Sequence, residues 1–214
     1  MEVACWAHAR RKFYDAQRSS GAVAHEALAR IGQLYAIERE LAQACSGAWS
    51  ELTGDERAAR VAAMRQEQAR PLLESFHQWL NEQHAKALPK SPIGQAIGYA
   101  LSNWTALCRY TEDGDLAIDN NLAERTLRPQ AIGRKNWIFA GSDSGARTAA
   151  VLYTMIASAK ANGVDPYAYL RDLYTRLPIL AAAPPIAEAD LTARLPDEWL
   201  KAHPEATFTP NRSP

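Results

Sequence analysis

The residues with the clearest potential for chemistry lie in one short run, DNNLAERTLRPQAIGRKN, at positions 119–136. Glu124 is the only glutamate of this run. Carboxylates hold the divalent ions of metal-dependent phosphodiester enzymes, and basic side chains contact phosphates. The run therefore fits such an enzyme, but it also fits a salt-bridged surface helix. The basic residues that follow Glu124 in it are Arg125, Arg128, Arg134 and Lys135.

A single carboxylate does not make a two-metal site, which needs several acidic side chains. Asp119 lies five residues before Glu124, about 140° away around a helix, so the two carboxylates diverge if both residues are helical. Glu124 and Arg128 have the i, i+4 spacing of an ordinary helical ion pair. On the residues alone, this Glu124–Arg128 pair is the favoured interpretation.

Cys5 and His8 form a C-x-x-H pair close to the start of the chain. Zinc needs four ligands, or three and a water, and no second pair of cysteines or histidines has a matching spacing. A small buried cysteine and a helix-capping or charge-partner histidine is the favoured interpretation, ahead of a metal site or a nucleophile. Arg10, Arg11 and Lys12 follow as a solvated helix face or as phosphate contacts.

The overall composition gives no argument for a nucleic-acid partner, because 24 basic and 24 acidic residues cancel to a net charge of zero. The three cysteines are too few and too scattered for a disulfide framework, which suits a reducing compartment. No apolar run reaches the length of about 18 residues that a membrane span needs. We therefore expect a soluble, cytoplasmic protein without a membrane partner.

Most of the chain has the apolar periodicity of amphipathic helices. Ser, Thr and Asp residues precede several of these segments as N-caps, and Pro71, Pro129 and Pro166 are expected to end or begin helices. The expected helices cover residues 8–17, 22 to about 48, 53 to about 70, 71 to about 88, 91–107, 119 to about 128, 146–161 and 167–177.

A few segments do not read as helix. Val3–Trp6 resembles the end of a strand, and Trp137–Ala140 a short strand or packed loop. Gly141–Gly145 is expected to be a flexible connector. Beyond Pro178 we expect a poorly ordered tail with a docked LPDEWL segment at residues 195–200. A nearly all-helical chain that opens with a strand end is what a fragment of an α/β domain would look like without its sheet.

Four motifs in order, CWAHARRKF, DNNLAERTLRP, IGRKNWIFAGSDSGARTAAVLYTMIASAKANGVDPYAYLRDL and LPDEW, resemble one family. The family is that of the bacterial insertion-sequence transposases of the sixty-six type, and the motifs resemble its catalytic DDE domain. The resemblance extends from Cys5 to about Trp199. It implies an RNase H-like fold with a helical insertion, and three acids, Asp, Asp and Glu, that bind two Mg²⁺ ions for DNA strand cleavage and transfer.

The resemblance assigns roles to individual residues. Glu124 corresponds to the glutamate of the DNN-x-x-ER motif, which makes it the expected catalytic residue and metal ligand. Cys5 and His8 correspond to the C-x-x-H element, a structural motif. The residues expected near DNA are Arg10, Arg11, Lys12, Asn120, Asn121, Arg125, Arg128, Arg134, Lys135 and Arg147.

The chain also departs from the family pattern. Both catalytic aspartates of the family precede the C-x-x-H element, whereas only four residues precede Cys5 here and none is Asp. We therefore expect this chain alone neither to hold Mg²⁺ tightly nor to catalyse transposition. The implied partners are DNA at transposon ends and target, the N-terminal portion or full-length transposase, and further copies in a homo-oligomer.

The expected fold class is mainly α, as a C-terminal fragment of an RNase H-like α/β transposase domain with most of the sheet missing. The expected parts are a core remnant at 1–20, a helical insertion at 21–110, the Glu motif and basic segment at 111–180, and a tail at 181–214. Two other functions fit the sequence. One is a non-catalytic DNA-binding or regulatory fragment, and the other is a decaying, partly folded relic.

Overall fold

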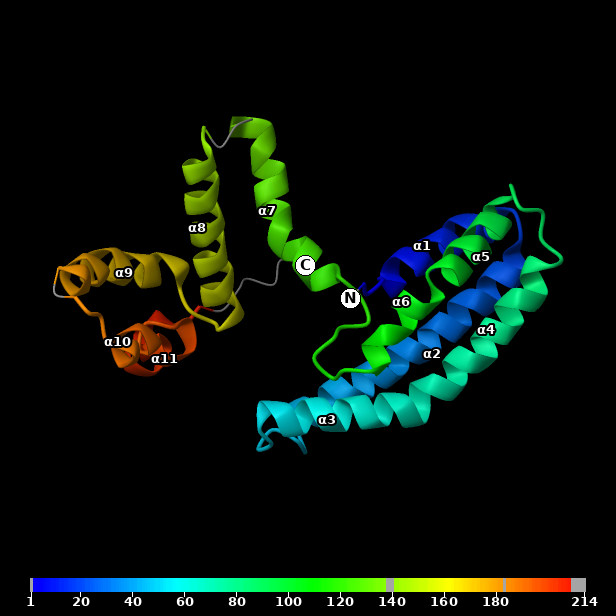
Figure 1. Ribbon diagram of the computed structural model, residues 1–214, viewed down its shortest axis with the longest axis horizontal. Helices are drawn as coiled ribbons and strands as arrows, with labels where there is room; N and C mark the ends of the chain where they lie inside the picture. The colour runs from blue at the N-terminus through cyan, green and yellow to red at the C-terminus, as the bar shows by residue number, and fades with distance from the viewer. Residues whose placement is uncertain (1, 138–140, 183, 209–214) are drawn as a thin grey trace. The chain divides into compact units, whose positions relative to one another are not determined.

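A computed structural model describes residues 2–137, 141–182 and 184–208, without the side chain of Trp137. The chain forms two compact units, Met1–Glu124 and Arg125–Pro214, and each is described by itself. The α-helices (Figure 1) are α1 (Trp6–Asp15), α2 (Gly21–Ser46), α3 (Gly54–Met64), α4 (Arg70–His84), α5 (Pro92–Ser102), α6 (Trp104–Cys108), α7 (Asn121–Trp137), α8 (Asp143–Ala161), α9 (Pro166–Ala181), α10 (Glu188–Thr192) and α11 (Pro196–Ala202).

The first unit is built on four helices, α1, α2, α4 and α5, that lie side by side in Figure 1 and pack against one another. Three aromatic residues join α1, α4 and α6. The Trp6 and Phe76 rings are stacked with centroids 6.1 Å apart, and Trp104 meets each of them edge-on at 5.8 Å. Trp6 and Phe76 are almost fully buried, so this cluster anchors the N-terminal helix in the core.

Helix starts follow the expected capping chemistry. Thr53 forms a capping box with Glu56 at the start of α3, and Ser91 accepts a hydrogen bond from the Gly94 amide at the start of α5. Such caps satisfy amide groups that have no partner within the helix. The break expected near Arg70 is not found: α3 continues through a π-helical segment, η2 (Arg65–Ala69), directly into α4, because the backbone stays in the right-handed helical region there.

The second unit has its own small core, formed by α8, α9 and α11. The Trp199 ring meets Tyr169 edge-on with centroids 5.4 Å apart, and its indole N–H donates to Asp172 over 2.9 Å. Docking of the LPDEWL segment is therefore confirmed. The expectation of a poorly ordered tail after Pro178 is wrong for this segment, because Trp199 is only 2% exposed and α9 continues to Ala181.

Three other expectations are corrected. Val3–Trp6 is not a strand end: the Ala4 amide donates to the Ala106 carbonyl and α1 starts at Trp6, because the described residues offer no neighbouring strand. Helix α7 continues through Pro129. The helix loses one backbone hydrogen bond at this position, because proline has no N–H to donate. Helix α8 starts at Asp143 within the expected connector, because Ser142 caps it.

The fold class is mainly α, as expected. Among the described residues, β-structure is limited to an isolated bridge between Val164 and Thr207. Residues 138–140 of the expected Trp137–Ala140 strand lie outside the described residues. No described helix is long and apolar enough to cross a membrane.

Candidate functional site

The C-x-x-H element lies against the DNN-x-x-ER motif at residues 119–125, here called the acidic motif, although more than a hundred residues separate them. The Trp6 amide donates to the Ile118 carbonyl over 3.2 Å, and the Asn120 amide donates to Cys5 Sγ over 3.3 Å. His8 Nε2 lies 3.4 Å from Glu124 Oε1. These contacts fix the segment that enters α7 onto the start of α1.

Cys5 has a structural role at this junction. It is the extended N-cap residue of α1, with φ −101° and ψ 118°, and its carbonyl accepts the amides of His8 and Ala9. Its sulfur is a weak acceptor for the Asn120 amide. Cys5, His8 and Asn120 also line a hollow of about 490 Å³. The favoured interpretation of His8 as a charge partner fits this geometry, whereas Cys5 is half-buried and not buried as expected.

Glu124 sits in the first turn of α7, where a carboxylate is stabilised by the helix dipole. Its side chain is 47% exposed, so it is open to water and to further ligands. Among the described residues its carboxylate lies 3.4 Å from the His8 imidazole, and it forms no ion pair with Arg128. The favoured Glu124–Arg128 pair is therefore wrong, because tertiary packing brings an imidazole of α1 to the carboxylate.

Asp119 precedes α7 and is not helical, so the estimated angle between Asp119 and Glu124 does not apply. Its Oδ1 accepts the Asn121 amide over 3.1 Å, and its Oδ2 accepts the Asn121 side-chain amide over 2.7 Å. The Tyr35 hydroxyl donates to the same Oδ2 over 2.8 Å. Burial and this hydrogen bond to Asp119 raise the pKa of the Tyr35 phenol, so Tyr35 stays a donor at neutral pH.

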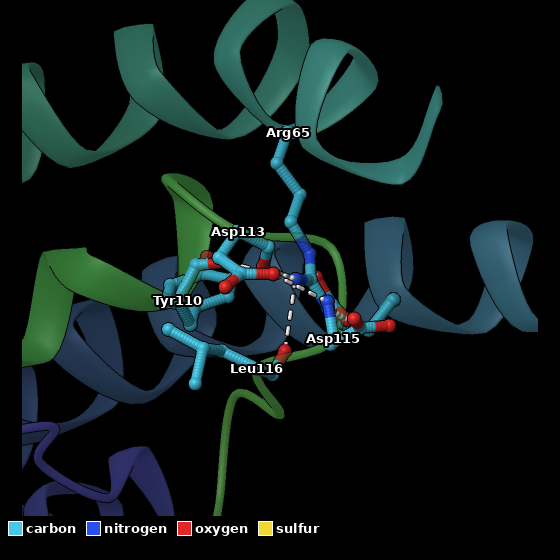
Figure 2. Close-up of polar contacts among 6 residues, drawn as sticks. Arg65, Tyr110, Asp113, Asp115 and Leu116 are labelled. Carbon is cyan, nitrogen blue, oxygen red and sulfur yellow. Dashed lines mark hydrogen bonds and ion pairs between the residues drawn. The ribbon is translucent and has the colours of Figure 1, made fainter. Parts of the chain in front are cut away.

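Arg65 fixes the segment that leads into this site (Figure 2). Its Nη1 donates to the carbonyls of Tyr110, Asp113 and Leu116 over 2.8, 2.9 and 2.9 Å. Its other nitrogens pair with Glu38. Sequence reasoning missed Arg65, but a signal existed. Arg65 is a charged residue at i+4 from the buried Val61, on the apolar stripe of the helix.

The basic residues of α1 point to different surroundings. Lys12 Nζ lies 4.7 Å from the centroid of the Tyr99 ring, in a cation–π contact. Arg10 lines a hollow with residues of α2, and Arg11 is exposed. The structure does not bring these three cations together into one patch. Their role as DNA contacts stays a prediction.

The basic residues of α7 are all exposed. At 100° per residue, Arg125, Arg128 and Lys135 fall within about 80° of the helix circumference, and Arg134 falls on the opposite side. Arg147, in the first turns of α8, lines an apolar hollow of about 590 Å³ between α8 and α9. Three of these cations thus share one helix face.

A Mg²⁺ ion at Glu124 would need oxygen ligands beyond this one carboxylate. Mg²⁺ prefers oxygen ligands in octahedral geometry and usually takes one or two carboxylates with waters and substrate phosphates. Within residues 2–137, 141–182 and 184–208, no three His, Cys, Asp or Glu side chains lie close enough to share a metal ion. Glu124 offers one carboxylate, and its neighbour is a nitrogen base.

Comparison with known families matches two parts of the chain. Residues 1–148 match the family described as "Transposase IS66 family", and residues 154–192 match the "IS66 C-terminal element". The first match contains the C-x-x-H element, the helices of the first unit and the acidic motif. The second contains the C-terminal part of α8 and all of α9 and α10.

Similar proteins occur in Sinorhizobium fredii, where they are described as uncharacterized. The protein y4hP is 36% identical over 211 residues, which cover 92% of this chain and 35% of y4hP. The protein y4qI is 38% identical over 174 residues, or 81% of this chain and 30% of y4qI. The chain thus spans about a third of the length of these relatives. No solved structure matches it, so the RNase H-like part of the expected fold stays a prediction. On the match over residues 1–148, the chain belongs to the IS66 family of transposases.

Proposed function

We propose that this chain is the C-terminal part of a DDE-type transposase and that Glu124 is its contribution to the metal site for DNA strand cleavage and transfer. The observation that carries the proposal is the position of Glu124. It is half exposed in the first turn of α7, and the C-x-x-H element lies beside it. Both elements belong to the part of the chain that matches the transposase family.

The remaining metal ligands come, in this proposal, from transposase residues outside these 214 positions. The donor set supports this, because no three His, Cys, Asp or Glu side chains cluster for a metal ion among the described residues. Bound Mg²⁺ would stabilise charge on the phosphodiester oxygens during transfer. Helix α7 also exposes Leu127 and Ile132 by 65% and 56%, which a further part of the transposase would cover.

The chain's own residues hold this carboxylate in position. The hydrogen bond from Asn120 to Cys5 and the Asp119–Asn121 contacts fix the start of α7. His8 orients Glu124 from the side of α1. Such supporting contacts tune a ligand's direction and commonly change metal affinity by about 10- to 100-fold when they are removed.

The test is strand transfer by a full-length transposase that contains this chain as its C-terminal part. Glu124→Gln is expected to abolish transfer, since a neutral amide is a poor Mg²⁺ ligand. Glu40→Gln, at an exposed position of α2, is the matched control and is expected to keep activity. Wild-type transfer by the Glu124→Gln protein would refute the assignment.

A second candidate function is a non-catalytic DNA-binding or regulatory fragment that joins full-length transposase in mixed oligomers. It is favoured by Arg125, Arg128 and Lys135, whose side chains form no ion pair with any described carboxylate. Duplex DNA binding by this chain that weakens steeply with salt would support it. If no binding of duplex DNA can be detected even at low salt, this function is excluded.

A further inference from the structure

A second hollow lies beside the acidic motif in the first unit and has a volume of about 350 Å³. Three segments form it: α1, α2 and the residues that lead into α7. We call it the Arg10–Arg39 hollow, after its two cations. The residues that matter for its chemistry are Arg10, Gly32, Tyr35, Arg39, Asp119 and Asn121.

The two guanidinium groups carry the positive charge of this hollow. Both side chains are exposed, and neither forms an ion pair with a carboxylate among the described residues. By contrast, Arg30 of the same helix α2 is paired with Glu26 over 2.8 Å. A planar guanidinium binds a phosphate through two parallel hydrogen bonds, which makes it a preferred phosphate ligand.

Asp119 is the acid in the hollow, and its charge opposes an anion. Both of its carboxylate oxygens already accept hydrogen bonds, from the Tyr35 hydroxyl and from Asn121. Two arginines and one aspartate leave the hollow with a formal charge of +1. Tyr35 adds no negative charge, because burial raises its pKa well above neutrality.

Gly32 lines the hollow and contributes no side chain to it. It lies within α2, and a Cβ added there would meet no atom within 4 Å. Glycine is a poor residue for a helix interior, and almost any other residue would favour the helix more. Because position 32 lines the hollow, a larger side chain there is expected to occupy part of its volume.

We propose that the Arg10–Arg39 hollow binds a phosphate group of a nucleic-acid backbone, with the two guanidinium groups as its ligands. The choice of a nucleic-acid phosphate over a free phosphate rests on the proposed function. Asp119, in the wall of the hollow, lies five residues before Glu124 in the chain. A strand held here would be positioned by its backbone, without any reading of its sequence.

The test measures binding of a fluorescein-labelled oligothymidylate to the full chain by anisotropy, without metal. Arg39→Gln is expected to weaken binding about tenfold, as the loss of a charge-assisted contact does, and to reduce the salt slope by about one. Gly32→Leu is expected to weaken binding as much while it keeps both cations. Arg18→Gln removes an exposed cation outside the hollow and is the matched control. Circular dichroism checks that each variant is folded.

Wild-type affinity in either Arg39→Gln or Gly32→Leu would overturn the proposal. Competition with inorganic phosphate at constant ionic strength distinguishes the two sources of phosphate. If the hollow variants lose inorganic phosphate but bind the oligonucleotide normally, the nucleic-acid assignment is wrong. The outcome is independent of strand transfer, so failure of the Glu124 assignment and failure of this one are separately visible.

Discussion

Arg65 and Glu38 form a largely buried, bidentate ion pair in the first unit. Arg65 Nε lies 2.9 Å from Glu38 Oε1, and Nη2 lies 2.7 Å from Oε2. The side chains are only 5% and 17% exposed. The remaining donor, Nη1, binds three backbone carbonyls of residues 110–116 (Figure 2). One guanidinium therefore joins α2, the π-helical segment η2 and the segment that leads into the acidic motif.

Arg65→Ala is expected to lower the free energy of unfolding of the first unit by about 3–5 kcal/mol, because it leaves Glu38 buried without a partner. Arg65→Lys is expected to recover only part of this loss, since a lysine lacks the planar fork. Urea denaturation followed by tryptophan fluorescence measures both. Arg70→Ala, which breaks the exposed pair with Glu74, should change stability by less than about 1 kcal/mol. Equal losses at both positions would contradict this interpretation.

Gly114→Ala tests the segment that Arg65 holds. A Cβ at position 114 would collide with the backbone of Ala58 in α3, and backbone atoms cannot rotate away. We expect a loss of about 1–3 kcal/mol, typical of overpacking. Gly98→Ala is the control, since its Cβ meets nothing within 4 Å and alanine favours helix α5 by up to about 1 kcal/mol. In thermal unfolding, Gly114→Ala is expected to lower the melting temperature and Gly98→Ala to raise it. An unchanged melting temperature in Gly114→Ala would disprove the close approach.

The helices were predictable because their cause is local. The apolar period gave α2 and α8 nearly at their observed ends, and Thr53, Ser91 and Asp165 cap helices as expected. The segments whose structure the local pattern did not predict are held by contacts between residues far apart in the sequence. Trp199 docks through contacts with Tyr169 and Asp172, which hold a proline-rich segment that has little periodicity of its own.

The candidate site was predictable only in part. The polar residues at positions 119–121 predicted a helix start, which put Glu124 in the first or second turn, and it lies in the first turn of α7. The partner of its carboxylate depends on a tertiary contact, which spacing along one helix does not contain. His8 reaches Glu124 because Cys5 and Trp6 bond to residues 118–120. Local spacing therefore suggested Arg128, which lies four residues further along the same helix, whereas the observed neighbour of the carboxylate is His8 of α1.

Tyr35→Phe is expected to destabilise the first unit by about 0.5–1.5 kcal/mol at neutral pH, because Asp119 loses a hydrogen-bond donor. The pKa of Tyr35 in the folded chain lies above the ordinary value of 10.0. Its contribution is therefore complete below pH 10 and is lost as the pH rises through the folded-state pKa. The alkaline fall in stability should be shallower in Tyr35→Phe. Tyr14→Phe, at an exposed tyrosine, should behave like wild type in the same urea titrations.

The second unit offers an acid-sensitive contact between Asp172 and Trp199. Burial raises the pKa of Asp172, but the hydrogen bonds from Arg176 and Trp199 lower it by more. The pKa therefore lies below the ordinary value of 3.8. The folded-state pKa is thus depressed, so the contribution is present above pH 3.8 and is lost as the pH falls through the folded-state value. Docking of α11 should therefore weaken only in acid.

The indole N–H resonance of Trp199 reports this contact directly. In the wild type at neutral pH, its exchange with water should be slow, because the N–H is bonded to a carboxylate over 2.9 Å. Asp172→Ala should speed exchange about tenfold at neutral pH, as expected for the loss of a contact of about 1.4 kcal/mol. Below pH 3.8 the wild type should approach the variant, after correction for the intrinsic pH dependence of exchange. Asp190→Asn, at an exposed acid of α10, should leave the protection unchanged. Equal protection in Asp172→Ala and wild type would mean that ring packing against Tyr169 and His203, and not the carboxylate, holds α11 in place.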